Sequence, residues 1–157
     1  SGYVMSANPV ASPQFREGLA QQWETLDVCF GETVSRDAPR FDAYMAKATT
    51  TGPKRACWNS WIAPHNWEGF FLNFGDMLVR AGDLRNAKAM YEATALSPTY
   101  AQWPYRGVAE RRLARLPSLP ATFAAAKPGE KEDVTMFGSA FACTGCHQAA
   151  GKPAVGG

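Results

Sequence analysis

Apolar side chains recur every three or four residues along much of this chain, and that spacing limits the folds open to it. Between residues 13 and 31 the recurrence gives a helix one apolar side. Ser12 and Pro13 suit its N-cap and first position, and Gly31 can end it. No segment alternates as a half-buried strand would, so the sequence predicts an all-α helical bundle. The apolar positions are Phe15, Leu19, Trp23, Leu26 and Phe30.

The same signals predict four more helices in the chain as far as Leu116. After an irregular arm over 1–12 and the first helix, a short helix begins near Asp37 and stops at the breaker 49–53. Asn66 is an N-cap for a helix over about 67–81. A helix that pairs with it into a hairpin follows, and a last helix over about 100–116 would cover that hairpin.

One pair of helices has a more specific pattern, in which Gly82 closes the first helix and Asp83 caps the second. Over residues 67–97 the spacing of small and aromatic residues resembles the tetratricopeptide repeat, departing from it at Thr94 and Pro98. The resemblance implies a helical hairpin. A free-standing array needs about three repeats, so we expect a helical body that contains one repeat-like hairpin. The matching positions are Phe71, Phe74, Gly75, Leu78, Gly82, Leu84, Ala87 and Tyr91.

The chain changes character after Leu116. Residues 117–133 hold several prolines and a charged run, and they predict an extended, solvated linker. We therefore expect a body over 1–116, the linker over 117–133, and a C-terminal helical segment over 134–157. That segment would be packed on the body or on a neighbouring molecule.

The C-terminal segment contains Cys143-Thr144-Gly145-Cys146-His147, a C-x-x-C-H motif. Cysteines three apart lie on one side of a helix, and the next residue can turn its imidazole toward a shared ligand. These residue types at this spacing match covalent haem attachment by two thioethers, with the histidine binding the iron. The C-x-x-C half alone also suits a redox dithiol or part of a zinc site. A zinc site needs a second close pair, and a thioredoxin-like dithiol needs a strand–helix context that the sequence lacks.

The motif resembles that of c-type cytochromes. The resemblance implies one covalent haem c held by Cys143 and Cys146, with His147 as the proximal iron ligand. It also implies export before haem attachment, hence a periplasmic or extracellular protein seen here as a processed form without its signal peptide. The flanks look like a class I cytochrome, but only ten residues follow His147 and none is Met or His. The motif's position resembles the cytochrome c′ type instead, departing from it at Gln148-Ala149-Ala150.

The ligand opposite His147 is left open by the sequence. His65 is the only other histidine and is the candidate distal ligand, although a histidine after proline also suits a surface or capping role. Met136 lies in the haem segment, where a continuous helix carries it away from the distal side. Without His65, the iron is open on that side or takes a ligand from a neighbouring subunit. Three methionines at helical spacing suit core packing better than ligation: Met45, Met77 and Met90.

Two cysteines remain outside the motif. In an oxidising compartment Cys29 and Cys57 are expected to form a disulfide, and the competing interpretation is two buried free thiols.

The net charge and the hydropathy of the chain limit the classes of partner that it can be expected to bind. A net charge of +2 does not favour nucleic acid or an anionic membrane, and no apolar run approaches the length of a membrane span. The arginines between 106 and 115 suit either an acidic redox partner protein or an ordinary solvated helix face.

Three functions follow from these observations. The first is a monohaem c-type cytochrome that carries or relays electrons outside the cytoplasm. The second is an open-site haem protein that binds NO or CO or reduces peroxide. The third is a haem-bearing assembly subunit, a homo-oligomer or part of a larger redox complex or filament. We expect no independent enzyme activity, since the sequence has no carboxylate pair, nucleophile–base set or phosphate loop.

Overall fold

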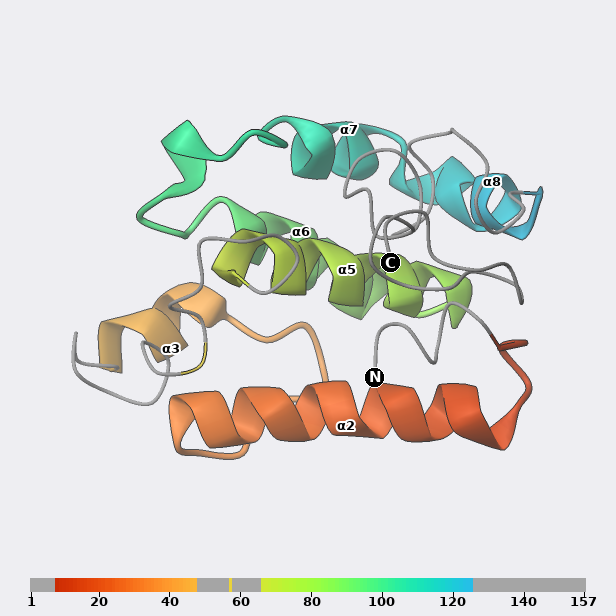
Figure 1. The fold of residues 1–157 in the computed structure, drawn as a ribbon, viewed down its shortest axis with the longest axis horizontal. Helices are drawn as coiled ribbons and strands as arrows, with labels where there is room; N and C mark the ends of the chain where they lie inside the picture. Colours follow the sequence, from red (N-terminus) through yellow and green to blue (C-terminus); the bar gives the residue numbers. More distant parts are fainter. Residues whose placement is uncertain (1–7, 48–56, 58–65, 126–157) are drawn as a thin grey trace, which may run out of the picture.

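The computed structural model describes residues 8–47, residue 57 and residues 66–125 of the chain (Figure 1). No strand occurs among these residues, so the predicted all-α fold is confirmed for this part of the chain. The α-helices are α2 (Pro13–Phe30), α3 (Phe41–Lys47), α5 (Trp67–Arg80), α6 (Leu84–Thr94), α7 (Val108–Ala114) and α8 (Leu119–Ala125). Two 3₁₀ turns, η1 (Tyr100–Gln102) and η2 (Leu116–Ser118), flank α7.

The helices are arranged in layers around α5 and α6. These two helices form a hairpin in the middle, with α2 along one side and α7 and α8 along the other (Figure 1). The short helix α3 lies at one end of the hairpin and contacts α6. The predicted hairpin is therefore present, and the core of the described protein is built against it.

The first helix has the ends that the sequence predicts. Ser12 Oγ accepts a hydrogen bond from the backbone N–H of Phe15 at 3.1 Å, and Pro13 occupies the first helical position. Gly31 ends the helix with a φ of 70°, a left-handed conformation that glycine adopts without strain. Its buried side faces the hairpin, with Phe15 and Leu26 fully buried.

The hairpin is also capped as predicted. Asn66 Oδ1 accepts from the N–H of Gly69 at 3.0 Å at the start of α5. The turn after α5 has Gly82 at a φ of 82°, and Asp83 Oδ1 then accepts from the N–H of Asn86 at 3.1 Å to begin α6. Local residues thus set the turn between the two helices.

The hairpin closes tightly because one helix has no side chain at the contact. A Cβ atom built on Gly75 would lie 2.5 Å from Cε1 and 2.7 Å from Cδ1 of Tyr91. The Tyr91 ring is fully buried against α5 as a result. Gly75 therefore fixes the distance between α5 and α6.

The predicted helix over 100–116 is wrong in its first half. Residues 100–102 form only the 3₁₀ turn η1, and α7 begins at Val108. Trp103 precedes Pro104 and has an extended ψ of 127°, as proline requires of its predecessor. Gly107, with a φ of 90°, then turns the chain into α7. These two breaks outweigh the helical spacing of the apolar residues.

The predicted linker over 117–133 is wrong where the structure describes it. Residues 116–118 form η2 and residues 119–125 form α8, which contacts α5. Leu119 and Phe123, one helical turn apart, are buried at 1% and 5% exposure. Pro120 lies in the first turn of α8, where its missing N–H has no helical partner to lose. The body therefore reaches residue 125, and 126–133 lie outside the described residues.

A helix that crosses a membrane must be both long and apolar. None of the helices in the described ranges meets these two requirements together.

Candidate functional site

The residues of the predicted haem site lie outside the described residues. These are Cys143, Cys146 and His147 of the motif, together with the candidate distal ligand His65. Met136 and the segment 134–157 also lie outside them. Their expected roles stay predictions.

An aromatic cluster fills the end of the body where α5 begins. Trp67 lies 4.5 Å from Phe71 and 6.1 Å from Phe30 between ring centroids, and Phe41 of α3 lies 4.9 Å from Phe71. The indole Nε1 of Trp67 donates to the backbone carbonyl of Ala93 at 2.9 Å. These rings form part of the hydrophobic core, which explains much of the chain's aromatic content.

The methionines of the helices pack as the sequence predicts. Met77 and Met90 are buried at 1% and 0% exposure within the core cluster. Met45 is partly buried against the same cluster. The thioether of Met77 lies 4.0 Å from Nη1 of Arg80.

A buried polar group joins the three helices α5, α6 and α7. Tyr91 Oη donates to Asp76 Oδ1 at 2.7 Å, and Arg112 Nε donates to the same oxygen at 3.1 Å. Arg112 Nη2 lies 3.4 Å from Asp76 Oδ2, and the side chains of Asp76 and Arg112 are 1% and 6% exposed. The guanidinium also lies 5.3 Å from the ring centroid of Phe123, which brings α8 onto the same centre.

The electrostatics of this centre hold Tyr91 as a neutral phenol. Burial raises the pKa of Tyr91 well above 10.0, and the Asp76 carboxylate raises it further. The Arg112 charge acts in the opposite direction but is the weaker influence. The phenol is therefore a hydrogen-bond donor that fixes Asp76, and Asp76 in turn neutralises Arg112.

Sequence reasoning missed the Asp76–Tyr91–Arg112 centre. The available signal was Asp76 itself, a carboxylate between Gly75 and Met77 in a predominantly apolar helix. A buried charge needs a partner, so Asp76 required a cation. Arg112 supplies it and is buried, which removes it from the predicted basic group. The remaining three arginines of that group, Arg106, Arg111 and Arg115, are exposed.

A second buried carboxylate lies near the N-terminus of α5. Glu68 is 1% exposed, and its Oε1 accepts hydrogen bonds from Ser97 Oγ at 2.7 Å and Thr99 Oγ1 at 2.5 Å. These contacts join α5 to the segment after α6. The charge lies in the first turn of α5, where the helix dipole favours an anion.

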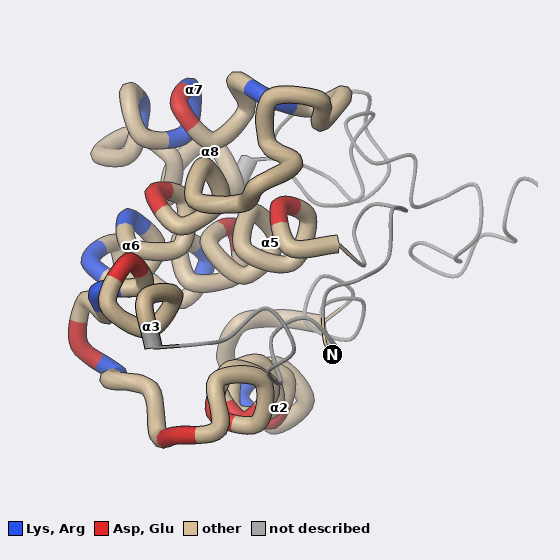
Figure 2. The backbone as a smooth tube through the Cα atoms, turned by 90° about the vertical axis from the view of Figure 1, so that its left-hand side faces the viewer, with Lys and Arg blue, Asp and Glu red and all other residues tan. Residues whose placement is uncertain are grey.

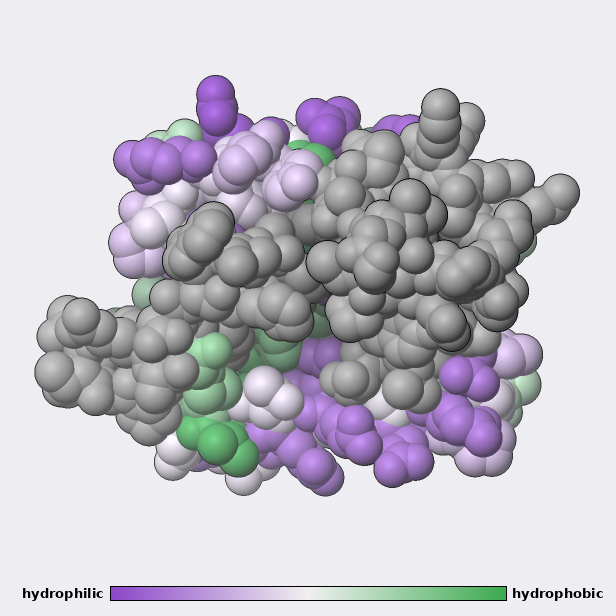
Figure 3. Space-filling model, in the orientation of Figure 1, coloured by the Kyte–Doolittle hydropathy of each residue, from purple (hydrophilic) through white to green (hydrophobic). Residues whose placement is uncertain are grey.

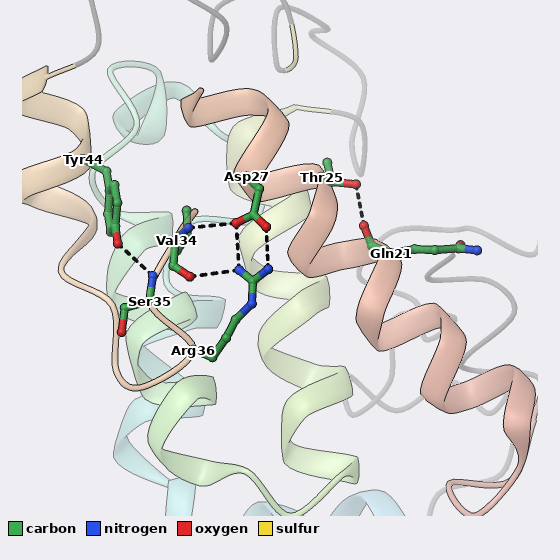
Figure 4. A network of polar contacts seen from close by, with 7 residues as sticks. All are labelled: Gln21, Thr25, Asp27, Val34, Ser35, Arg36 and Tyr44. Atoms are coloured by element: carbon green, nitrogen blue, oxygen red, sulfur yellow. Dashed lines mark hydrogen bonds and ion pairs between the residues drawn. The ribbon is translucent and has the colours of Figure 1, made fainter. Parts of the chain in front are cut away.

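A polar network fixes the loop between α2 and α3 (Figure 4). The carboxylate of Asp27 accepts from both terminal nitrogens of Arg36, at 2.8 and 2.5 Å, and from the N–H of Val34 at 2.8 Å. The hydrogen bond from Arg36 holds the pKa of the Asp27 carboxyl below its ordinary value of 3.8, although burial opposes this. Tyr44 Oη of α3 accepts from the N–H of Ser35 at 2.8 Å.

The same loop is held to the hairpin by Asn86. Its Oδ1 accepts from the N–H of Ala38 at 2.8 Å, and its Nδ2 donates to the carbonyl of Arg36 at 2.9 Å and to Asp83 Oδ2 at 2.6 Å. Ala38 has a φ of 44°, a left-handed conformation that is unfavourable for a residue with a Cβ. The contacts of Asn86 therefore stabilise a strained turn.

The structure joins Cys29 and Cys57 by a disulfide, the pairing that the sequence predicts. Cys29 lies at the end of α2 and is 1% exposed, whereas Cys57 is exposed. Their Cα atoms are 5.8 Å apart, and the bond closes a loop of 28 residues. The pairing leaves Cys143 and Cys146 as the other two of the four cysteines.

Apart from Glu68, Asp76 and Arg112, the charged residues of the described body are spread over its outside. Lys and Arg positions follow α6 and the segment through α7 (Figure 2), and hydrophilic surface follows α2 in the view of Figure 3. Several of these charges are paired, as in Arg85 with Asp37 and Lys88 with Glu92. This distribution is typical of solvated helix faces.

Many of the body's polar groups thus bind to one another. Within the described ranges, no group of three or more His, Cys, Asp and Glu side chains is placed to hold a metal ion. Comparison with family models, with curated proteins and with solved structures finds no match for this chain.

Proposed function

We propose that this protein is a monohaem c-type cytochrome that carries or relays electrons outside the cytoplasm. The observation that carries the proposal is the motif Cys143-Thr144-Gly145-Cys146-His147. Two thiols and an adjacent imidazole are the donors that covalent haem attachment needs. The disulfide between Cys29 and Cys57 supports the choice, because it uses the other two cysteines and suits an oxidising compartment.

The donor set fits a haem by its chemistry. Cys143 and Cys146 would hold the porphyrin through thioether bonds, and His147 would bind the iron. When bound, the haem supplies a one-electron ferric–ferrous couple. The chain's own residues would keep the cofactor in place, orient the His147 imidazole and restrict the access of water.

Haem attachment is tested by producing the protein with a c-type maturation system and measuring the mass of the denatured chain. We expect the mass of one covalent haem, together with the sharp visible bands of a reduced c-type haem. Replacing Cys143 and Cys146 by alanine should abolish the covalent adduct. The matched control replaces Cys29 and Cys57, which should leave haem attachment intact. A wild-type chain without covalent haem after such maturation contradicts the proposal.

An open iron site is the second candidate. It is favoured by the burial of Met77 and Met90 in the core, which removes two possible distal ligands and leaves His65 as a candidate. Addition of CO to the reduced protein separates the two functions. A ready spectral shift supports gas or peroxide chemistry at the iron, and an unchanged low-spin spectrum supports a six-coordinate electron carrier. If His65 is the distal ligand, replacing it by alanine should turn the unresponsive low-spin spectrum into one that shifts readily with CO.

A further inference from the structure

Nearly all residues of helix α5 are buried, on every side of the helix. The described helices, however, contact α5 on only three of its sides. The helices that contact it most are α6, α8 and α2. Gly75 faces Tyr91 of α6, and the ring of Phe74 lies 5.0 Å from that of Trp23 in α2. Asp76 binds Arg112, beside α8. These contacts identify three directions around α5.

Asn73 faces the fourth direction. It precedes Gly75 by two residues, which is about 200° around a helix of 3.6 residues per turn. Asn73 therefore lies opposite α6, between the directions of Phe74 and Asp76. Figure 2 shows α6 on one side of α5 and no described element on the opposite side.

The state of the Asn73 side chain shows that this side of α5 is covered. Asn73 is only 7% exposed, and its Oδ1 has no hydrogen-bond partner in the described part of the chain. A buried amide oxygen left without a donor lowers stability by about 1–3 kcal/mol, and native proteins nearly always supply one. The occupant of this side must therefore bring both apolar cover and a hydrogen-bond donor.

We propose that the chain's own C-terminal segment, residues 126–157, packs against this side of α5 and donates a hydrogen bond to Asn73 Oδ1. The path of the chain supports this occupant. Phe123 of α8 lies 5.3 Å from the guanidinium of Arg112, which binds Asp76, one helical turn from Asn73. The segment therefore begins next to the side of α5 that it would cover.

The residues of the segment suit that position. Phe137, Ala140 and Phe141 precede the haem motif and supply the apolar contacts that a helix side needs. Packing there brings Cys143-Thr144-Gly145-Cys146-His147 against the helical body, so that α5 forms one wall of the haem pocket. This last consequence depends on the proposed function, whereas the docking of the segment does not.

The proposal is tested by photo-cross-linking in the full-length protein. Phe70 lies one turn before Asn73 and is partly buried, so we replace it by p-benzoylphenylalanine, another aromatic residue. The matched control places the same residue at Tyr105, a partly buried aromatic next to Trp103 at a centroid distance of 5.6 Å. After irradiation, we expect the Phe70 variant to cross-link within one chain to a peptide from 126–157. The Tyr105 variant should not do so.

A different occupant would give a different cross-link. Arg80 Nη2 donates to the carbonyl of Asn8 at 3.2 Å, so the N-terminal arm also begins near this side of α5. A cross-link to a peptide from 1–16 or from 48–66 overturns the proposal. A cross-link between isotopically light and heavy chains mixed before irradiation also overturns it, in favour of a second copy. So does the absence of any cross-link in a variant with unchanged helicity. Haem attachment is scored separately by mass, so failure of one proposal is not read as failure of the other.

A second variant tests the hydrogen bond. Replacing Asn73 by leucine keeps the branched shape of the side chain and removes the acceptor, so the C-terminal segment should detach more often. We expect cleavage after Lys131 by a trace of trypsin to become about tenfold faster, the factor given by loss of one buried hydrogen bond. The control replaces exposed Gln21, whose amide donates to exposed Glu17, by leucine. Equal cleavage rates in the two variants contradict the assignment of Asn73.

Discussion

At the scale of single residues, the body depends on polar groups that are buried and matched in charge. Asp76 and Arg112 neutralise each other, and Tyr91 adds a further hydrogen bond to the carboxylate. Removing one member leaves the others buried with a lost partner, which is more harmful than removing a surface pair. The stability of the hairpin is therefore sensitive to small changes at this centre.

Replacing Tyr91 by phenylalanine tests this dependence. We expect the free energy of unfolding to fall by about 2 kcal/mol, because a buried carboxylate loses a neutral donor while the ring remains. Urea denaturation followed by circular dichroism measures the change. The control is the same substitution at Tyr100, whose hydroxyl donates to exposed Glu110 and whose loss should matter less. Equal losses in the two variants would show that burial of the phenol is unimportant.

The same variant should change how stability depends on pH. The pKa of Tyr91 is raised well above 10.0 in the folded state, so the unfolded chain loses this proton first as the pH rises. The stabilisation is complete below pH 10 and falls above it, by about 1.4 kcal/mol per pH unit for one proton. Unfolding measured between pH 9 and 11 should therefore be less steeply pH-dependent in the Tyr91→Phe protein than in the wild type.

At the scale of secondary-structure elements, the separation of α5 and α6 is set by Gly75. Replacing Gly75 by alanine places a Cβ against the Tyr91 ring, and we expect unfolding to become easier by about 2 kcal/mol. The clash is specific to the ring, so the same substitution in a Tyr91→Leu background should have a smaller effect. Denaturation of the four proteins gives the coupling energy between the two positions. Additive effects would mean that α5 and α6 adjust their distance freely.

The loop between α2 and α3 depends on Asn86. An Asn86→Ala substitution removes three hydrogen bonds and leaves the strained turn at Ala38 without this support. We expect a loss of about 2–3 kcal/mol in the free energy of unfolding. Combining it with Ala38→Gly should recover part of that loss, since glycine adopts a positive φ without strain. No recovery would indicate that the hydrogen bonds alone determine the effect.

The ends of the elements show what the sequence can predict. Ser12, Gly31, Asn66 and Asp83 act through neighbouring backbone groups, so their roles could be read locally. The prediction of a helix over 100–116 is wrong in its first half. Pro104 and Gly107 break the helix there, although the apolar residues keep a helical spacing. The sequence does not indicate α8 because the prolines in and around it are typical of a linker, although Pro120 is placed where a helix tolerates proline. The Asp76–Arg112 pair joins residues far apart in sequence, and only the fold brings them together.

At the scale of the whole molecule, the disulfide ties the end of α2 to the chain before α5. Replacing Cys29 and Cys57 by serine opens a loop of 28 residues, and we expect a loss of about 3–4 kcal/mol in the free energy of unfolding. Comparison of the wild type with and without a reducing agent should reproduce the difference. If neither treatment changes the denaturation midpoint, the disulfide has no part in stability. Haem attachment through Cys143 and Cys146 should be the same in the wild type and in the variant that lacks Cys29 and Cys57.

The tight contact between Gly75 and Tyr91 also has a consequence for the order of folding. The two residues are close in sequence, so the α5–α6 hairpin can form before the longer loop to α2 is closed. We expect this hairpin to be the folding nucleus, onto which α2 and α8 later dock. Stopped-flow kinetics should then show that Gly75→Ala mainly slows refolding, whereas Leu26→Ala in α2 mainly accelerates unfolding.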